Sequence, residues 1–241
     1  MRRYVAEGFG TFFMVLCGTG TIALAGLAPS QALGSLAAGL VFGLSVAAMI
    51  YLIGEVSGGH INPAVTAGFL VAKRFPREHL AAHVASQCVG AILGAGVVAI
   101  VAHSSPQALG RAEMHHFGAN GWSWGLHVPW WAAFVTELAA SFAFVSVFLV
   151  VRHESRKSQL DGLFIGMTVA ALHIAFGPVT GPSLNPARSL GPALFAGWDA
   201  IDQLWLYILA PVAGGALAGA TTKAFLGSKG EKKPKEGSGG D

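Results

Sequence analysis

The sequence predicts an all-α membrane protein in which six transmembrane helices and two re-entrant half-helices form an inverted repeat. Three observations support this prediction: the composition, six long apolar segments, and an Asn-Pro-Ala tripeptide that occurs twice, each time opening a short apolar segment. Of the 241 residues, 53% are hydrophobic and only 11% are charged, whereas soluble domains carry about 25% charged residues. The composition therefore favours a membrane protein over a soluble one.

Six apolar segments are each long enough for a transmembrane helix, which needs roughly 20 mostly apolar residues. The expected spans are 4–27, 32–54, 79–102, 130–151, 160–178 and 203–225. Their short connections leave no room for a separate soluble domain, so we expect one domain over residues 1–226. The charged, Gly-rich tail at 227–241 is expected to be disordered. Cys17 and Cys88 fall inside spans, where thiols act as small apolar groups.

The basic residues predict the orientation of the chain. All but Arg111 and Arg188 fall on one side of the membrane, at Arg2, Arg3, Lys73, Arg74, Arg77, Arg152, Arg156, Lys157, Lys223, Lys229, Lys232, Lys233 and Lys235. An even number of spans places both termini on the same side, and the positive-inside rule makes that side cytoplasmic. The net charge of +3 therefore reflects topology, and no nucleic-acid partner is expected.

The connection at 103–128 is interpreted as an extracellular loop between the two halves of the chain. His115 and His116 beside Glu113 could bind a metal, but a cluster in a polar loop is expected to be solvated. We therefore expect no metal site and no cofactor.

The two halves of the chain repeat each other, with repeat one at about 1–102 and repeat two at about 130–226. Each half contains three spans, so the two copies must be inverted in the membrane. The short segments at 62–72 and 185–196 would reach roughly 16 Å, about half of a 30 Å hydrocarbon core. Such segments are expected to be re-entrant half-helices that meet near the membrane centre, an architecture known among transporters.

Two acidic residues occupy matching places in the repeats, Glu7 in the first span and Glu137 in the fourth. A carboxylate in a membrane helix is costly and normally faces the interior with a partner. We expect both to be structural, holding re-entrant backbone by hydrogen bonds. A proton relay is the alternative, although no chain of further acids supports it.

The tripeptides Asn62-Pro63-Ala64 and Asn185-Pro186-Ala187 each have the chemistry of a helix start. Asn is a preferred N-cap, and Pro is favoured at the first helical position. One such tripeptide would be weak support for any function. Two copies at matching places in two repeats are strong support for a paired structural role.

These two tripeptides and their surroundings, SGGHINPAVT and TGPSLNPARSLGP, resemble the aquaporin family. The resemblance covers nearly the whole chain and implies a channel domain over 1–226 in a cytoplasmic membrane, with water as the permeant. It also implies a homotetramer with one pore per subunit. The carbonyls expected to line the two approaches to the pore centre belong to Gly59, His60, Ile61, Gly181, Pro182 and Ser183.

The resemblance also implies a constriction formed by Arg188 with an aromatic residue from the second span and a residue from the fifth. The family spacing assigns these places to Phe42 and His173, and a fourth place to Pro182. His173 and Arg188 are expected to donate hydrogen bonds and to narrow the opening, so that water passes and glycerol does not. Ser189, where glycerol-transporting relatives have Asp, supports the same interpretation, as does Ala193.

Three departures from the family pattern leave other functions open. Pro182 stands where relatives have Thr, Cys, Ala or Gly, and Tyr207-Ile208 stands where water channels have Phe-Trp. Glu55 stands near the cytoplasmic mouth, where many relatives have His. The alternative to a water channel is therefore a broader facilitator for glycerol, ammonia, carbon dioxide or metalloid hydroxides. An ion- or proton-coupled transporter is a third hypothesis. An enzyme is the least favoured hypothesis because no catalytic motif is present.

Overall fold

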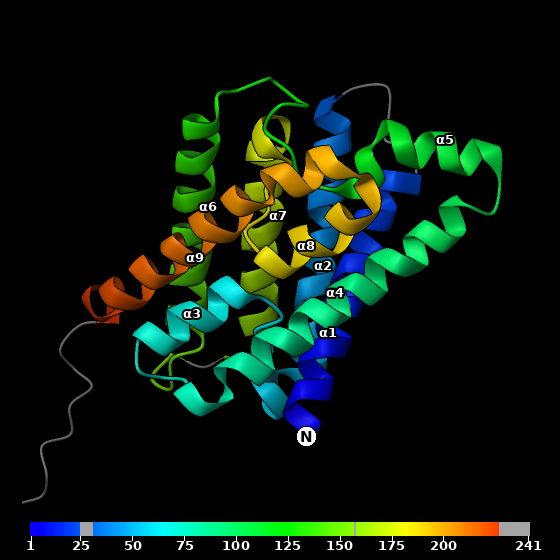
Figure 1. Cartoon of the computed structure of the whole chain (residues 1–241). Coiled ribbons are helices and arrows are strands. Elements are labelled where there is room, and N and C mark those ends of the chain that lie inside the picture. The colour runs from blue at the N-terminus through cyan, green and yellow to red at the C-terminus, as the bar shows by residue number, and fades with distance from the viewer. Residues whose placement is uncertain (25–30, 157, 227–241) are drawn as a thin grey trace, which may run out of the picture.

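Six long helices make up most of the described part of the chain (Figure 1). The computed structural model describes residues 1–24, 31–156 and 158–226, so the predicted tail and the end of the first expected span lie outside the described residues. The long helices are α1 (Arg2–Leu24), α2 (Gln31–Ser57), α4 (Leu80–Ala102), α6 (Trp130–Val151), α7 (Asp161–Thr180) and α9 (Trp198–Leu226). Each is long and apolar enough to cross a membrane. The described ranges contain no strand, and the predicted fold class is confirmed.

Two short helices, α3 (Pro63–Val71) and α8 (Pro186–Ala196), lie among the long ones. Each begins as its sequence predicts. Asn62 caps α3 and Asn185 caps α8, and in both cases proline is the first helical residue. Each cap satisfies backbone N–H groups of the first turn, which have no partner within the helix.

The packing of the helices follows an inverted repeat. α1 packs on α4, and their counterparts α6 and α9 pack on each other in the same way. The second helices of the two repeats, α2 and α7, pack against each other and join the halves. Each short helix crosses to the other repeat, so that α3 packs on α9 and α8 packs on α4. The two short helices are thereby fixed by long helices from both halves.

The sequence predicts a loop at 103–128, but this connection also contains helical segments. It contains α5 (Pro106–Met114) and a 3-10 turn, η2 (His116–Gly118), and another 3-10 turn, η1 (Arg77–His79), precedes α4. Ser105 caps α5 by accepting a hydrogen bond from the Ala108 N–H at 3.2 Å, a start signal that the sequence analysis overlooked. α5 lies at the end of the bundle opposite the N-terminus (Figure 1).

Among the described residues, no group of three or more His, Cys, Asp or Glu side chains could hold a metal ion. His116 instead stacks on Trp124, with ring centroids 3.7 Å apart and an interplanar angle of 9°. Burial lowers the pKa of His116 below its usual value.

Helices α1 and α4 approach so closely at Gly90 that a side chain there has no space. A Cβ at Gly90 would lie 2.0 Å from the Gly8 carbonyl oxygen, whereas a Cβ at Gly96, on the same helix, would make only an ordinary contact at 3.6 Å. We expect Gly90→Ala to lower the free energy of unfolding by about 1–3 kcal/mol through overpacking. Gly96→Ala should change it little. Thermal unfolding of both variants in detergent checks this, and equal midpoints would contradict it.

Candidate functional site

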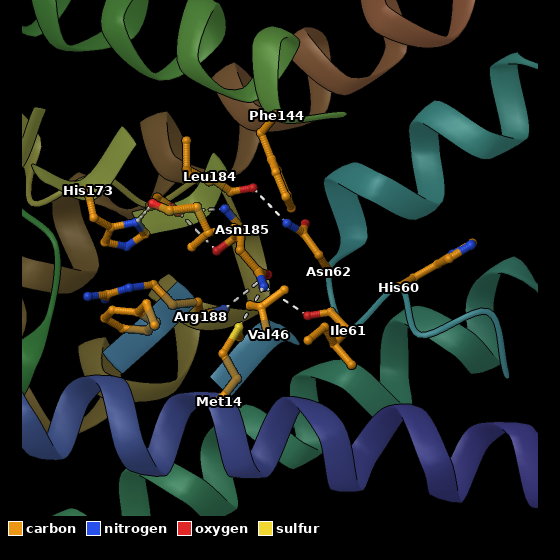
Figure 2. Close-up of a pocket in the computed structure, with 13 residues that line it drawn as sticks. Met14, Val46, His60, Ile61, Asn62, Phe144, His173, Leu184, Asn185 and Arg188 are labelled. Atoms are coloured by element: carbon orange, nitrogen blue, oxygen red, sulfur yellow. Dashed lines mark hydrogen bonds between the residues drawn. The ribbon is translucent and has the colours of Figure 1, made fainter. Parts of the chain in front are cut away.

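A narrow cavity lies between the N-terminal ends of α3 and α8 (Figure 2). Its volume of about 20 Å³ suffices for a water molecule, which needs roughly 10–15 Å³ by the same measure. Met14, Val46, Phe144 and Val169 form an apolar wall. The polar groups of the cavity come from the two short helices, from the segments that lead into them, and from His173 of α7 at one end.

The two asparagines form a crossed junction at the centre of the cavity. Asn62 Nδ2 donates to the Leu184 carbonyl at 2.8 Å, and Asn185 Nδ2 donates to the Ile61 carbonyl at 2.9 Å. The side-chain oxygens face the other way and accept from their own helices, Asn62 from the Ala64 N–H and Asn185 from the Ala187 and Arg188 N–H groups. Each asparagine thus caps one half-helix and links it to the segment that precedes the other.

Each amide nitrogen at the junction has a second hydrogen. That of Asn185 lies on the side of Met14, whose sulfur is 3.9 Å from Nδ2 and is only a weak acceptor. A water molecule in the cavity therefore meets donors, not acceptors, at the asparagine side chains.

The residues just before the asparagines adopt matching unusual conformations. Ile61 has a φ of 43° and Leu184 a φ of 55°, a left-handed region that residues with a Cβ rarely adopt and that costs about 1–3 kcal/mol at each position. Both carbonyls accept from the asparagine of the opposite repeat. The unusual conformation is thus part of the junction.

Glu7 fixes the first of these segments from behind. Its Oε1 accepts from the His60 N–H at 2.9 Å and its Oε2 from the Ile61 N–H at 2.6 Å. Ser57 and Gln87 side chains donate to the same carboxylate at 2.6 Å and 2.7 Å. The carboxylate is fully buried, and the His83 Nε2 atom lies 3.5 Å from its Oε2.

Glu137 does the same for the second segment. Its Oε1 accepts from the Ser183 N–H and the Thr180 hydroxyl, both at 2.8 Å, and its Oε2 accepts from the Leu184 N–H at 3.1 Å. It too is fully buried. The two acids therefore hold the two re-entrant segments in corresponding ways.

His60 lies at one end of the cavity (Figure 2). Its ring packs against Phe69, with centroids 4.5 Å apart, and its Nδ1 lies 3.1 Å from the Thr66 hydroxyl. His83, fully buried on α4, packs edge-on against the same ring with centroids 5.3 Å apart. The His60 ring at this end of the cavity is therefore held by other aromatic rings.

Phe42, His173 and Arg188 meet at the other end of the cavity. The Phe42 and His173 rings stack with centroids 4.7 Å apart, and the Arg188 Cζ lies 4.8 Å from the centre of the Phe42 ring. Phe42 fits against Gly18, where a Cβ would lie 2.1 Å from the Phe42 Cε1 atom. Three residues chosen by sequence spacing are thus in contact, although they come from α2, α7 and α8.

Two residues that the sequence analysis missed hold Arg188. Its Nη1 donates to the Gly118 carbonyl at 2.9 Å and to the Asn120 side-chain oxygen at 2.7 Å. Within the described part of the chain, Nε and Nη2 are buried without a hydrogen-bond partner, so they remain available to a molecule in the cavity. Nothing in the polar sequence around Gly118 and Asn120 marks them as partners of Arg188.

Some of the predicted lining residues surround the central cavity and others do not. Pro182, Gly59 and Gly181 are not part of the cavity lining, and the Gly181 carbonyl accepts instead from Asn120 Nδ2. His60, Ile61 and Ser183 do line the cavity, together with Leu184. The prediction left out Leu184, which precedes its asparagine just as Ile61 does. Aligning the two repeats on Asn62 and Asn185 would have found it.

His173 also differs from the expectation that it donates into the opening. Its Nδ1 lies 2.9 Å from the Val169 carbonyl, and a carbonyl can only accept, so Nδ1 carries the hydrogen. In the neutral ring Nε2 is then an acceptor. This Nε2 is buried and has no partner among the described residues.

Comparison with known proteins agrees with this arrangement. The family description "Major intrinsic protein" matches residues 1–221. The chain is 39% identical to an Aquaporin Z of Bradyrhizobium diazoefficiens, over 91% of each chain. It is 38% identical to a glycerol uptake facilitator protein-like 6 of Lactiplantibacillus plantarum, over 90% of this chain and 95% of that protein.

A solved structure has the same fold. The aquaglyceroporin from Plasmodium falciparum superposes with a TM-score of 0.81 at 25% identity, covering 93% of this chain and 96% of that one. With six apolar helices and these relatives, the chain is a multi-pass membrane protein. It belongs to the major intrinsic protein family.

Proposed function

We propose that the chain is a passive, bidirectional water channel of the cell membrane that excludes protons and ions. The observation that carries the proposal is the crossed junction, in which Asn62 and Asn185 cap two opposed half-helices beside a cavity of water size. Its relatives named Aquaporin Z support the same function. The channel needs no cofactor, energy source or covalent chemistry.

Proton exclusion follows from the donors at the junction. Two helix N-termini point at the cavity and bring positive partial charge from both sides. A water molecule there accepts from Asn62 or Asn185 and must direct its own hydrogens away from them. A proton-conducting chain needs waters that all point one way, so this reversal breaks it. The same positive potential repels cations, as pore dipoles do in other channels.

Size selection is assigned to Phe42, His173 and Arg188. The stacked rings form one wall of the constriction, and Arg188 presents its Nε and Nη2 hydrogens to the lumen. His173 Nε2 offers an acceptor on the wall that the two rings form. Water can use both kinds of group and is small enough to pass, whereas a three-carbon polyol would have to displace a ring.

The alternative function is facilitated passage of glycerol or another small neutral solute. The relative named as a glycerol uptake facilitator supports it. Of the sequence features that favoured it, Pro182 does not line this central cavity. Tyr207 is also absent from the lining and is buried with its hydroxyl 3.5 Å from the Thr180 carbonyl.

The assembly and orientation remain part of the proposal. Both termini are assigned to the cytoplasm because of the basic residues on that side. A homotetramer is assigned by family resemblance. Exposed apolar side chains such as Leu40 and Leu44 on α2 would face lipid or a neighbouring subunit.

The test is an osmotic step on proteoliposomes of known protein content. We expect water-driven shrinkage well above that of empty vesicles, and glycerol-driven reswelling close to theirs. Shrinkage equal to that of empty vesicles, with folded protein shown by circular dichroism, would overturn the water channel. Reswelling as fast as shrinkage would favour the glycerol facilitator.

A further inference from the structure

The loop between the repeats reaches over the constriction at Asn120. This asparagine is only 3% exposed, although it lies in a polar connection, and its side chain contacts α8 as well as the segment that follows α7. Its oxygen accepts from Arg188 Nη1 and from the Ser189 hydroxyl, both at 2.7 Å. Its Nδ2 donates to the Gly181 carbonyl and lies 3.4 Å from the Thr180 carbonyl.

The loop is itself held by contacts that do not involve Arg188. Phe117 is buried against α1 and α4 in a cluster that includes Ala23 and Val98, and it precedes Gly118, the other acceptor for Arg188. On the far side, Gln203 of α9 accepts from the Trp122 N–H at 2.9 Å and donates to the Ser123 hydroxyl at 3.0 Å. Asn120 is therefore a fixed group between two anchors.

We propose that Asn120 is a positioning residue that draws the Arg188 guanidinium out of the lumen and so keeps the constriction open to water. This inference rests on the proposed water channel. Arg188 has only two acceptors in the described structure, Gly118 and Asn120. Both lie on the loop, while Nε and Nη2 are left for water. Both hydrogen bonds therefore hold the Arg188 side chain towards the loop, which lies outside the pore.

Without Asn120, the Gly118 carbonyl is the one acceptor among the described residues that still holds the guanidinium on the loop side, and two groups on the lumen side compete with it. The Phe42 ring already lies beneath Cζ at 4.8 Å and attracts the cation. His173 Nε2 is an acceptor without a partner among the described residues. Arg188 would then turn towards these two groups and occupy the space through which water passes. Ser189, which shares the acceptor of Asn120, would lose the same contact and keep that with Ser183.

The test compares unit water permeability, per folded channel, in proteoliposomes of four proteins. Asn120→Leu removes the acceptor at similar volume, and we expect about a tenfold loss, as expected when one charge-assisted hydrogen bond is lost at the barrier. Asn120→Asp keeps an oxygen that accepts from Arg188. Its water permeability should stay within about twofold of the wild type, because a hydrogen bond between guanidinium and carboxylate is stronger than one between guanidinium and a neutral amide. Gln203→Leu removes another buried amide from the same loop without touching Arg188, and it should also stay within about twofold, since no lumen contact changes.

The temperature dependence of water flux separates positioning from folding. Fewer folded channels would lower the total flux but leave the slope of the protein-dependent Arrhenius plot unchanged, whereas an obstructed lumen steepens it. We expect a steeper slope only for Asn120→Leu. If this variant does not fold, Asn120→Ala takes its place with the same expected result.

Three outcomes would overturn the inference while leaving the water channel intact. These are unchanged permeability in Asn120→Leu, an equal loss in Asn120→Asp, or an equal loss in Gln203→Leu. A wild-type protein that conducts no water would instead contradict the proposed function itself. The four measurements therefore distinguish the two failures.

Discussion

Replacing His173 with glycine and Phe42 with alanine in the same chain should raise glycerol permeability by about tenfold or more, the range by which pocket size discriminates between substrates. The two rings are stacked at 4.7 Å and form one wall of the constriction. Their removal leaves Arg188 as the main side chain at the narrowest place, with its lumen-facing donors available to glycerol hydroxyls. Glycerol-driven reswelling of proteoliposomes measures the effect.

The matched control is Phe164→Ala, which removes an aromatic ring from α7 where it is half exposed on the outside of the bundle. It should change neither water nor glycerol permeability. If the double variant still conducts water and excludes glycerol like the wild type, the assignment of size selection to Phe42 and His173 is contradicted.

Replacing Glu7 with leucine should destabilise the protein by about 4 kcal/mol, because several hydrogen bonds to a buried charge are lost together. The substitution leaves the His60 and Ile61 N–H groups buried without an acceptor. It also releases the left-handed backbone at Ile61, whose carbonyl holds Asn185. We expect a large fall in the thermal unfolding midpoint and loss of water flux in whatever protein remains folded.

Glu113→Leu is the control, because Glu113 is exposed on α5. Its expected effect on stability is within about 0.5 kcal/mol, as for other surface substitutions. Glu7→Gln should fall between the two, since glutamine keeps one acceptor oxygen but turns an amide N–H towards backbone donors. A wild-type midpoint and flux in Glu7→Leu would contradict the role assigned to the buried acids.

The parts of the fold that the sequence predicts are those set by local chemistry. Six apolar segments specify six helices, because the hydrocarbon core demands their length and composition. Asn62 and Asn185 specify the starts of α3 and α8, because a cap and a proline act within one turn. Glu7 and Glu137 stand out because a carboxylate inside an apolar segment needs a partner.

The parts that the sequence does not predict depend on the path of the connections between the helices. Asn120 lies in a polar connection where any asparagine would look solvated, and only the folded loop brings it to Arg188. The hydrogen on His173 is set by the Val169 carbonyl one turn earlier, which the sequence shows only once the helix is known. The register of Leu184 could have been found, since it is set by the repeat.

The most direct test of the account measures water and proton flux in one preparation of proteoliposomes. An osmotic step reports water by light scattering, and an imposed pH gradient with a potassium ionophore reports protons by an enclosed dye. The crossed asparagine junction predicts water flux far above that of empty vesicles and proton flux equal to theirs. Proton flux that rises with the amount of channel, in step with the water flux, would contradict it.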